Sequence, residues 1–141
     1  MNDLVLIAEL LTTPQTVALV GYSADPSRPS NAVSRYLRAH GFRVIPVNPQ
    51  LEGATIDGER AYDRLVDVPH DARVGFVDVF RRGEFLDAVV DDAVAAGMKA
   101  IWFQLDLGNV AAAERAERAG LRVVWDRCTE IEHRRLRRVR A

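Results

Sequence analysis

The chain has 141 residues, of which 48% are hydrophobic and 28% charged, and its formal net charge is −1. This length fits one domain with one sizeable core, so we expect residues 1–141 to form a single domain. The balanced charge argues against nucleic-acid binding, no apolar run is long enough to span a bilayer, and the single Cys128 excludes an internal disulfide and indicates a reducing cytosol.

The predicted elements alternate between helices and strands along the chain. Residues 1–13 predict a short amphipathic helix, and residues 17–21 predict a buried strand that ends on a glycine. Further strands are predicted at 42–47, 74–79, 100–104 and 121–125, and further helices from the 21–31 turn to about residue 40, at 84–96, at 109–119 and within the basic segment 127–141.

This alternation predicts an α/β fold: a Rossmann-like, doubly wound parallel sheet of about five strands in three α/β/α layers. We expect the strand order 3-2-1-4-5, with ligands beyond the carboxyl ends of the strands beside strand one. Residues 50–72 are the least regular, and we expect a small strand pair and one helical turn that cross to the other edge of the sheet.

Residues 17–49 carry a strand, a tight turn and a helix N-terminus, the order that makes a phosphate site. Gly21 ends the strand and lets the backbone approach a ligand closely. Every α/β protein has such a turn, so the glycine alone is a weak signal. The second and third glycines of the dinucleotide fingerprint G-x-G-x-x-G are missing, and no acidic residue follows the second strand, which disfavours NAD.

Five short motifs, in the same order, resemble the small single-domain coenzyme A-binding proteins, which are similar to the CoA-binding domain of the succinyl-CoA synthetase α subunit. The motifs are G-Y-S-x4-R-P-S at 21–30, V-I-P-V-N-P at 44–49, D-V-F-R at 78–81, W-x-Q at 102–104 and D-R-C-x-x-I-E-H at 126–133. The resemblance covers about residues 10–138 and implies that CoA or an acyl-CoA is the ligand. The synthetases carry a phosphorylatable histidine in a second domain that residues 1–141 do not contain, so ligase chemistry is not implied.

The resemblance also implies which residues hold the cofactor. The 21–30 turn would hold the ADP part of CoA, residues 47–49 would line the adenine pocket, and residues 78–81 would lie along the pantetheine arm. The expected cofactor-binding residues are Gly21, Tyr22, Ser23, Arg28, Ser30, Val47, Asn48, Pro49, Val79, Phe80, Arg81 and Gln104.

Four of these residues also have purely structural interpretations. Ser30 is equally well placed to cap the helix that follows it. The pair Asn48-Pro49 also turns the chain out of its strand. Gln104 either bonds a pantetheine amide or ties adjacent loops together.

Groups typical of enzymes are scarce: the sequence has no catalytic triad, no P-loop and no cluster with metal-ligand spacing. We therefore expect a non-catalytic carrier, sensor or regulatory module without a metal, with a homodimer or a partner enzyme as further options. The alternative is a small CoA-dependent redox protein in which Cys128, at a helix N-terminus, exchanges with a CoA disulfide. Against this, a free cysteine is more often a small buried hydrophobic residue.

Overall fold

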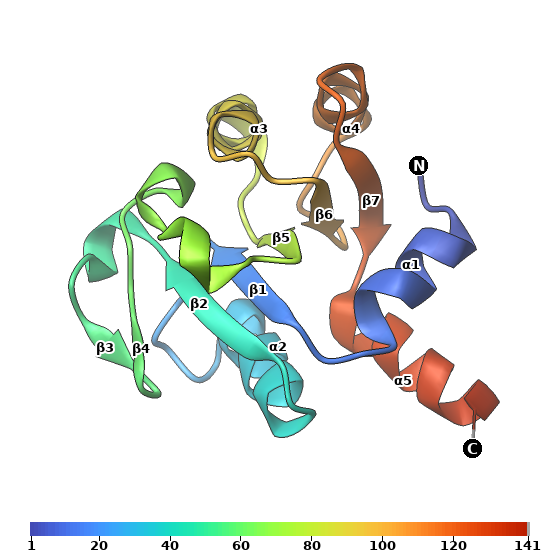
Figure 1. Cartoon of the computed structure of the whole chain (residues 1–141), viewed down its shortest axis with the longest axis horizontal. Helices are drawn as coiled ribbons and strands as arrows, with labels where there is room; N and C mark the ends of the chain where they lie inside the picture. Colours follow the sequence, from blue (N-terminus) through green and yellow to red (C-terminus); the bar gives the residue numbers. More distant parts are fainter. Residues whose placement is uncertain (141) are drawn as a thin grey trace.

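The computed structural model describes residues 1–140, and its centre is a parallel sheet of five strands. The strands are β1 (Thr16–Val20), β2 (Arg43–Val47), β5 (Phe76–Val79), β6 (Ala100–Gln104) and β7 (Arg122–Arg127). Helices α3 (Leu86–Ala95) and α4 (Val110–Arg118) cover one face of the sheet, and α1 (Leu4–Leu11), α2 (Pro29–Ala39) and α5 (Thr129–Arg140) cover the other (Figure 1). The predicted doubly wound α/β fold is confirmed.

Each face of the sheet has its own hydrophobic core, because side chains alternate along a strand. Val77 and Val79 of β5 point to the α3/α4 side, whereas Phe76 packs with Trp102 on the α1/α2/α5 side. The strand residues of β5 and β6 are buried throughout, as expected for strands covered on both faces. This double cover leaves only the strand ends open to a ligand.

The predicted strand order is wrong. The strands lie in the order β2-β1-β5-β6-β7, which places the third strand on the far side of β1 rather than beyond β2. Pro46 lies within β2 and has no N–H to donate, and a proline within a strand is confined to an edge strand. Since the predicted order would have made β2 an internal strand, Pro46 was a signal against it. The direction of winding still changes at β1, so the ligand site predicted beside this strand keeps its place.

The connection from β2 to β5 contains the predicted strand pair, β3 (Thr55–Ile56) and β4 (Glu59–Arg60). It has three short 3₁₀ turns instead of one helical turn: η1 (Pro49–Leu51), η2 (Leu65–Asp67) and η3 (His70–Ala72). Tyr62 exchanges backbone hydrogen bonds with Pro46 and Asn48, so this segment covers the free edge of β2. The chain then returns across β1 and does not run to the other edge of the sheet.

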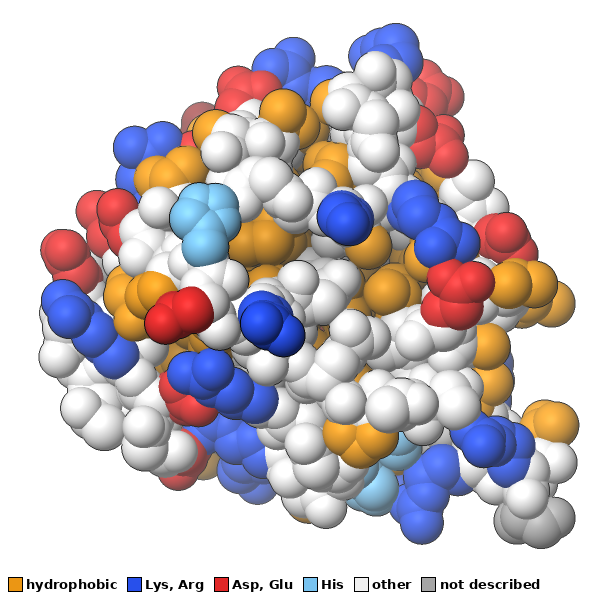
Figure 2. Space-filling model, viewed as in Figure 1, with side chains coloured by type: hydrophobic (Ala, Val, Ile, Leu, Met, Phe, Trp, Pro, Cys, Tyr) orange, Lys and Arg blue, Asp and Glu red, His pale blue; other side chains and the backbone are white. Residues whose placement is uncertain are grey.

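The carboxyl-terminal elements differ from the prediction in detail. A 3₁₀ turn, η4 (Gly83–Phe85), precedes α3, and β7 extends two residues beyond the predicted strand through a bulge at Asp126. Helix α5 begins at Thr129 and carries most of the basic residues of segment 127–141, which gather over this end of the molecule (Figure 2). Within residues 1–140, no helix combines the length and the apolar character needed to cross a bilayer.

Candidate functional site

A groove of about 740 Å³ runs across the carboxyl ends of the strands. Its walls come from the first turn of α2 and from the segments that follow β1, β2, β5 and β6. The lining residues are Gly21, Ser23, Arg28, Pro29, Ser30, Asn48, Pro49, Gln50, Phe80, Arg81, Arg82 and Leu107. The site is therefore assembled from five separate stretches of chain at the topological switch point.

Gly21 directly follows β1 and lies close to Phe80 and Arg81, which follow β5. Its φ is +85°, and its N–H donates to the carbonyl oxygen of Val47 at 2.9 Å. A Cβ at this position would lie 2.6 Å from the carbonyl oxygen of Phe80 and 2.9 Å from Cδ of Arg81. Only glycine meets both the positive φ and the close approach to Phe80 and Arg81, whereas the predicted close approach to a ligand stays a prediction.

The turn after Gly21 is held by its own side chains. The N–H of Ser23 donates to Oγ of Ser30 at 3.0 Å, and Nδ2 of Asn31 donates to the carbonyl oxygen of Ser23 at 3.0 Å. Ser30 is thus the second residue of α2 and not its N-cap, a position that Arg28 takes without a side-chain hydrogen bond. The capping role considered for Ser30 is wrong, because its hydroxyl group braces the turn instead.

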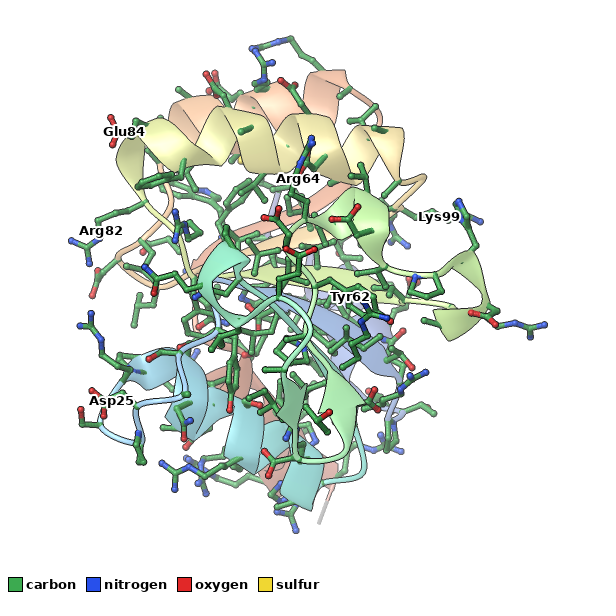
Figure 3. All side chains as sticks on the ribbon, turned by 90° about the vertical axis from the view of Figure 1, so that its left-hand side faces the viewer. Asp25, Tyr62, Arg64, Arg82, Glu84 and Lys99 are labelled. Atoms are coloured by element: carbon green, nitrogen blue, oxygen red, sulfur yellow. The ribbon has the colours of Figure 1, made fainter. Side chains whose placement is uncertain are left out.

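Asp25 is the acidic residue of this turn. Ser27 donates to Oδ1 of Asp25 from its N–H at 2.9 Å and from its hydroxyl group at 2.8 Å, and these hydrogen bonds lower the pKa of the Asp25 carboxyl. The carboxylate folds back on its own loop and does not line the groove. Figure 3 shows Asp25 on the same side of the molecule as Arg82, which extends into solvent.

Asn48 fixes the segment after β2 against the turn after β1. Its Nδ2 donates to the carbonyl oxygen of Tyr22 at 2.8 Å, and its Oδ1 accepts from the N–H of Gln50 at 2.9 Å. The second of these bonds starts the 3₁₀ turn η1. Asn48 therefore does turn the chain out of its strand, and its place in the groove wall leaves the ligand role open as well.

The charge of the groove is positive. Its twelve lining residues include three arginines, Arg28, Arg81 and Arg82, and no carboxylate. Within residues 1–140, none of these three guanidinium groups forms an ion pair, whereas Arg43 and Arg64 are held by Glu59 and Asp92. Together with the N-terminus of α2, the unpaired cations give the groove a positive charge that suits a multiply charged anion.

A second, smaller hollow of about 270 Å³ adjoins the groove on the α3 side of the sheet and shares Gly21, Pro49 and Arg81 with it. Its lining is mainly apolar and includes Val47, Leu65 and Val89. Polar side chains from Asp63, Arg64 and Asp92 stand around it. In Figure 3, Arg64 points toward α3. There its Nη2 donates to Oδ1 of Asp92 at 2.6 Å and its Nε donates to Oδ2 at 3.0 Å.

The structure brings eight of the twelve expected residues to the groove, namely Gly21, Ser23, Arg28, Ser30, Asn48, Pro49, Phe80 and Arg81. Val47 lines the smaller hollow instead. The side chains of Tyr22 and Val79 are buried in the two hydrophobic cores, so neither side chain faces the groove. Their predicted part in cofactor binding therefore concerns the backbone of these two residues and stays a prediction.

Gln104 belongs to a buried polar network below the strand ends. Its Nε2 donates to Oδ1 of Asp78 at 2.6 Å and to Oγ1 of Thr129 at 2.8 Å, and Thr129 donates to Oδ2 of Asp78 at 3.0 Å. Both N–H groups of the amide are thereby used. The structural role considered for Gln104 is present, since the residue ties β5, β6 and α5 together.

Asp78 is fully buried and has no cation beside it. Burial raises the pKa of its carboxyl to about 7, although the hydrogen bonds from Gln104 and Thr129 act in the opposite direction. The carboxyl lies beneath the groove and does not line it. Asp78 therefore titrates inside the protein, where it holds the strand ends together and does not face the groove.

Cys128 immediately precedes α5 and packs partly buried against the core on the α1/α2/α5 side. Burial raises the pKa of its thiol, and the N–H groups at the start of the helix only partly oppose this effect. A lowered pKa was the basis of the redox hypothesis. The raised pKa of Cys128 instead favours its interpretation as a small packed side chain.

Four residues of the groove were not among the expected cofactor-binding residues: Pro29, Gln50, Arg82 and Leu107. Arg82 was a candidate from its place after the third strand, although the resemblance assigned it no role. Leu107 carries no such signal, because its position depends on how the loop after β6 folds back over Phe103. Val47 and Pro49 of the smaller hollow were expected to line an adenine pocket, but its walls around η2 and η4 were missed because these segments are irregular.

Fold and groove together define a doubly wound domain with an anion site at its switch point. A family model described as "CoA binding domain" matches residues 15–134, and this chain belongs to that family. The chain is 32% identical over 127 residues to the uncharacterised Bacillus subtilis protein YneT, covering 90% of this chain and 91% of that one.

Solved structures agree with this assignment. A Thermus thermophilus protein, cell-free ID.343, is 38% identical with a TM-score of 0.86, over 96% of this chain and 99% of that one. A dinucleotide-forming acetyl-coenzyme A synthetase from Candidatus Korarchaeum cryptofilum is 26% identical with a TM-score of 0.68, over 83% of this chain and 27% of the synthetase. The same fold thus stands alone in one neighbour and forms part of a larger enzyme in the other.

Proposed function

We propose that this chain binds coenzyme A or an acyl-CoA in the groove, and that it acts as a carrier, sensor or regulatory module without catalysis of its own. The pyrophosphate lies against the turn after β1 and the N-terminus of α2, where Ser23, Arg28 and Ser30 face it. The observation that carries the proposal is the lining of three unpaired arginines without a carboxylate, in a chain of this family.

The two ends of the ligand leave the pyrophosphate in opposite directions. The adenine enters the smaller apolar hollow beside Val47 and Pro49. The pantetheine arm runs along the groove past Phe80 toward Leu107, where backbone groups and apolar side chains suit an amide chain. The ligand therefore spans both hollows, which meet at Gly21.

The absence of catalysis in this proposal rests on the chemistry of the groove. Its lining contains no histidine, cysteine or carboxylate, the usual groups for proton transfer or nucleophilic attack. Among the described residues 1–140 there is no group of three or more His, Cys, Asp or Glu side chains arranged to hold a metal. Binding and presentation of the ligand are what this lining can do.

Calorimetric titration with CoA, acetyl-CoA, dephospho-CoA and NAD tests the proposal. We expect CoA and acetyl-CoA to bind and NAD to give no measurable heat, because no carboxylate follows β2 to hold the ribose of NAD. Equal affinity for CoA and NAD would contradict the proposal.

The variant Ser23→Glu locates the site. A carboxylate at this turn repels the phosphates and should abolish CoA binding while the circular dichroism spectrum stays unchanged. Thr13→Glu is the matched control, since it adds the same charge at an exposed position before β1, away from the strand ends. Unchanged CoA affinity in folded Ser23→Glu protein would remove the turn from the site.

A further inference from the structure

The turn between β1 and α2 is held from behind by two residues of α2 that do not line the groove. Nδ2 of Asn31 donates to the carbonyl oxygen of Ser23 at 3.0 Å, and Nη2 of Arg35 donates to the carbonyl oxygen of Pro26 at 3.2 Å. Ser23 is a groove residue, whereas Asn31 and Arg35 are not. Both carbonyl groups are thereby directed toward the helix that supports the turn.

Arg35 and Asn31 are joined to each other, so they act on the turn as one unit. They lie one helical turn apart, and Nε of Arg35 donates to Oδ1 of Asn31 at 2.9 Å. Asn31 is buried, and its Nδ2 also donates to Oη of Tyr22 at 3.3 Å. Because a guanidinium group only donates, Arg35 keeps the amide oxygen on its own side and the amide nitrogen toward Ser23. With the amide reversed, two oxygens would face each other at Ser23.

The other hydrogen bonds of this turn are local. The N–H of Asp25 donates to Oγ of Ser23 at 3.2 Å, and the N–H of Arg28 donates to the carbonyl oxygen of Asp25 at 3.0 Å. These bonds shape the loop but do not attach its outer part to the body of the helix. Within residues 1–140, the hydrogen bond from Arg35 is the only one that reaches Pro26. Arg35 is therefore the attachment of the outer part of the turn.

We infer that Arg35 is a positioning residue for the phosphates of the ligand, although it does not line the groove. A backbone carbonyl oxygen carries a partial negative charge and would repel a phosphate beside it. Arg35, directly at Pro26 and through Asn31 at Ser23, keeps two such oxygens on the helix side of the turn. The inference rests on the proposed function, because it takes the phosphates of the bound cofactor as the anion. A turn fixed before binding costs less to order when the ligand arrives.

Arg35→Lys tests the inference, because the side chain is exposed and lysine keeps its charge. One ammonium group does not reproduce the planar fork that reaches Asn31 and Pro26 together. By calorimetry, we expect the affinity for CoA to fall about fivefold, the scale of one lost hydrogen bond, and nearly as far as in Arg35→Ala. The matched control is Arg118→Lys, at an exposed position of α4 on the opposite face of the sheet, which should leave the affinity unchanged. Full rescue by lysine would overturn the inference.

Salt separates positioning from attraction. The loss in Arg35→Lys should be the same at low and high salt, because the charge is kept and only the geometry of the turn changes. In this respect Arg35 should differ from Arg28, which lines the groove and whose contribution salt should screen. A loss in Arg35→Lys that disappears at high salt would mean that Arg35 acts by its charge, and would overturn the positioning role.

Hydrogen exchange of residues 23–28 supplies a measurement that needs no ligand. We expect exchange in Arg35→Lys to be faster by about twofold or more, with an unchanged midpoint of urea unfolding, because only the turn is released. Unchanged exchange in this segment would overturn the inference. Failure of the wild-type protein to bind CoA would instead count against the proposed function, whereas wild-type binding with full affinity in Arg35→Lys counts against Arg35 alone.

Discussion

Gly21 is the residue on which the whole site depends, because the groove and the apolar hollow meet at its backbone. The space that its missing side chain leaves is filled from one side by the carbonyl oxygen of Phe80 and by Cδ of Arg81. Any larger residue would separate β1 from β5 at the point where both hollows open. The arginines around Gly21 are side chains on this backbone, so the contribution of each to ligand affinity can be measured by replacing one residue at a time.

Arg28 is the arginine that faces solvent at the start of α2, and Arg28→Ala should weaken CoA binding by about 1–3 kcal/mol, the usual scale for a charge-assisted hydrogen bond. The loss should shrink as salt rises, because an exposed charge contact is screened. Titrations at low and high salt measure it. Arg73→Ala, an exposed arginine outside the groove, is the control, and a loss at Arg28 that does not vary with salt would indicate a structural role.

Cys128 should behave as a packed side chain and react slowly with a thiol reagent in the native protein. Its thiol is partly buried and its pKa is raised, so the reactive thiolate is scarce at neutral pH. The rate should be unaffected by CoA. Labelling in denaturant supplies the reference rate, and fast native labelling with protection by CoA would revive the redox hypothesis.

At the scale of elements, α5 is attached to α2 by a small aromatic cluster. Oη of Tyr36 donates to Nδ1 of His133 at 2.7 Å when that ring is neutral. His40 lies between them, with Nδ1 at 2.8 Å from the carbonyl oxygen of Tyr36 and Nε2 at 2.8 Å from a guanidinium nitrogen of Arg137. Arg134 stands over the Tyr36 ring from the same helix. The cluster is therefore already rich in positive charge.

Acidification should loosen this contact between α2 and α5. Burial lowers the pKa of His133, and His40, Arg137 and Arg134 add to the effect. A group whose folded pKa is lowered in this way favours the folded state while neutral, so its contribution is present above the unfolded value of 6.5 and is lost as pH falls below it. Hydrogen exchange of residues 129–140 at pH 5.5 and 7.5, corrected for intrinsic rates, should show weaker protection at the lower pH.

The matched variants are His133→Gln and His70→Gln. Glutamine at position 133 stays neutral at both pH values, so the difference in protection should disappear, whereas His70 is exposed in η3 and its replacement should leave the difference intact. Equal protection of wild-type α5 at the two pH values would contradict this account.

At the scale of the whole molecule, the sequence predicted the layers and the turn between β1 and α2 because both depend on local patterns. Alternating elements and the strand-turn-helix run from Val17 to Ala39 need no long-range information. The strand order was not predicted, although Pro46 carried the signal that β2 is an edge strand. Val47 and Pro49 of the apolar hollow were expected to line a pocket, whereas the contributions of Asp63 and Phe85 could not be predicted, because they depend on the irregular segments around η2 and η4.

Burial also explains which of the expected residues direct their side chains away from the groove. Tyr22 and Val79 stand next to groove residues in the sequence, yet a residue at a strand end points to one face of the sheet or the other. The motif G-Y-S therefore contributes its first and third residues to the groove and its second to the core. The motif identifies the loop, whereas burial in the folded chain decides which of its side chains line the groove.

Asp78, in the central strand β5, should make the stability of the whole molecule depend on pH. The pKa of its carboxyl is raised from 3.8 to about 7 in the folded protein. The unfolded chain therefore releases this proton first as pH rises above 3.8, and folding stability falls by roughly 1.4 kcal/mol per pH unit until the folded pKa is passed. This contribution of Asp78 is favourable at low pH, is lost between pH 4 and 7, and is flat above pH 7, opposite in sign to that of His133.

Asp78→Asn keeps the shape of the side chain and removes the titration. The variant should match wild-type stability near pH 4 and exceed it at pH 8 by about 1–3 kcal/mol, less than the full linkage value because an amide accepts the donors from Gln104 and Thr129 less well than a carboxylate. Urea unfolding at a series of pH values measures the difference, with the exposed Asp71→Asn as the control. An Asp78→Asn variant that is less stable than wild type at pH 8 would contradict this account. It would mean that the hydrogen bonds from Gln104 and Thr129 stabilise the ionised carboxylate by more than its burial destabilises it.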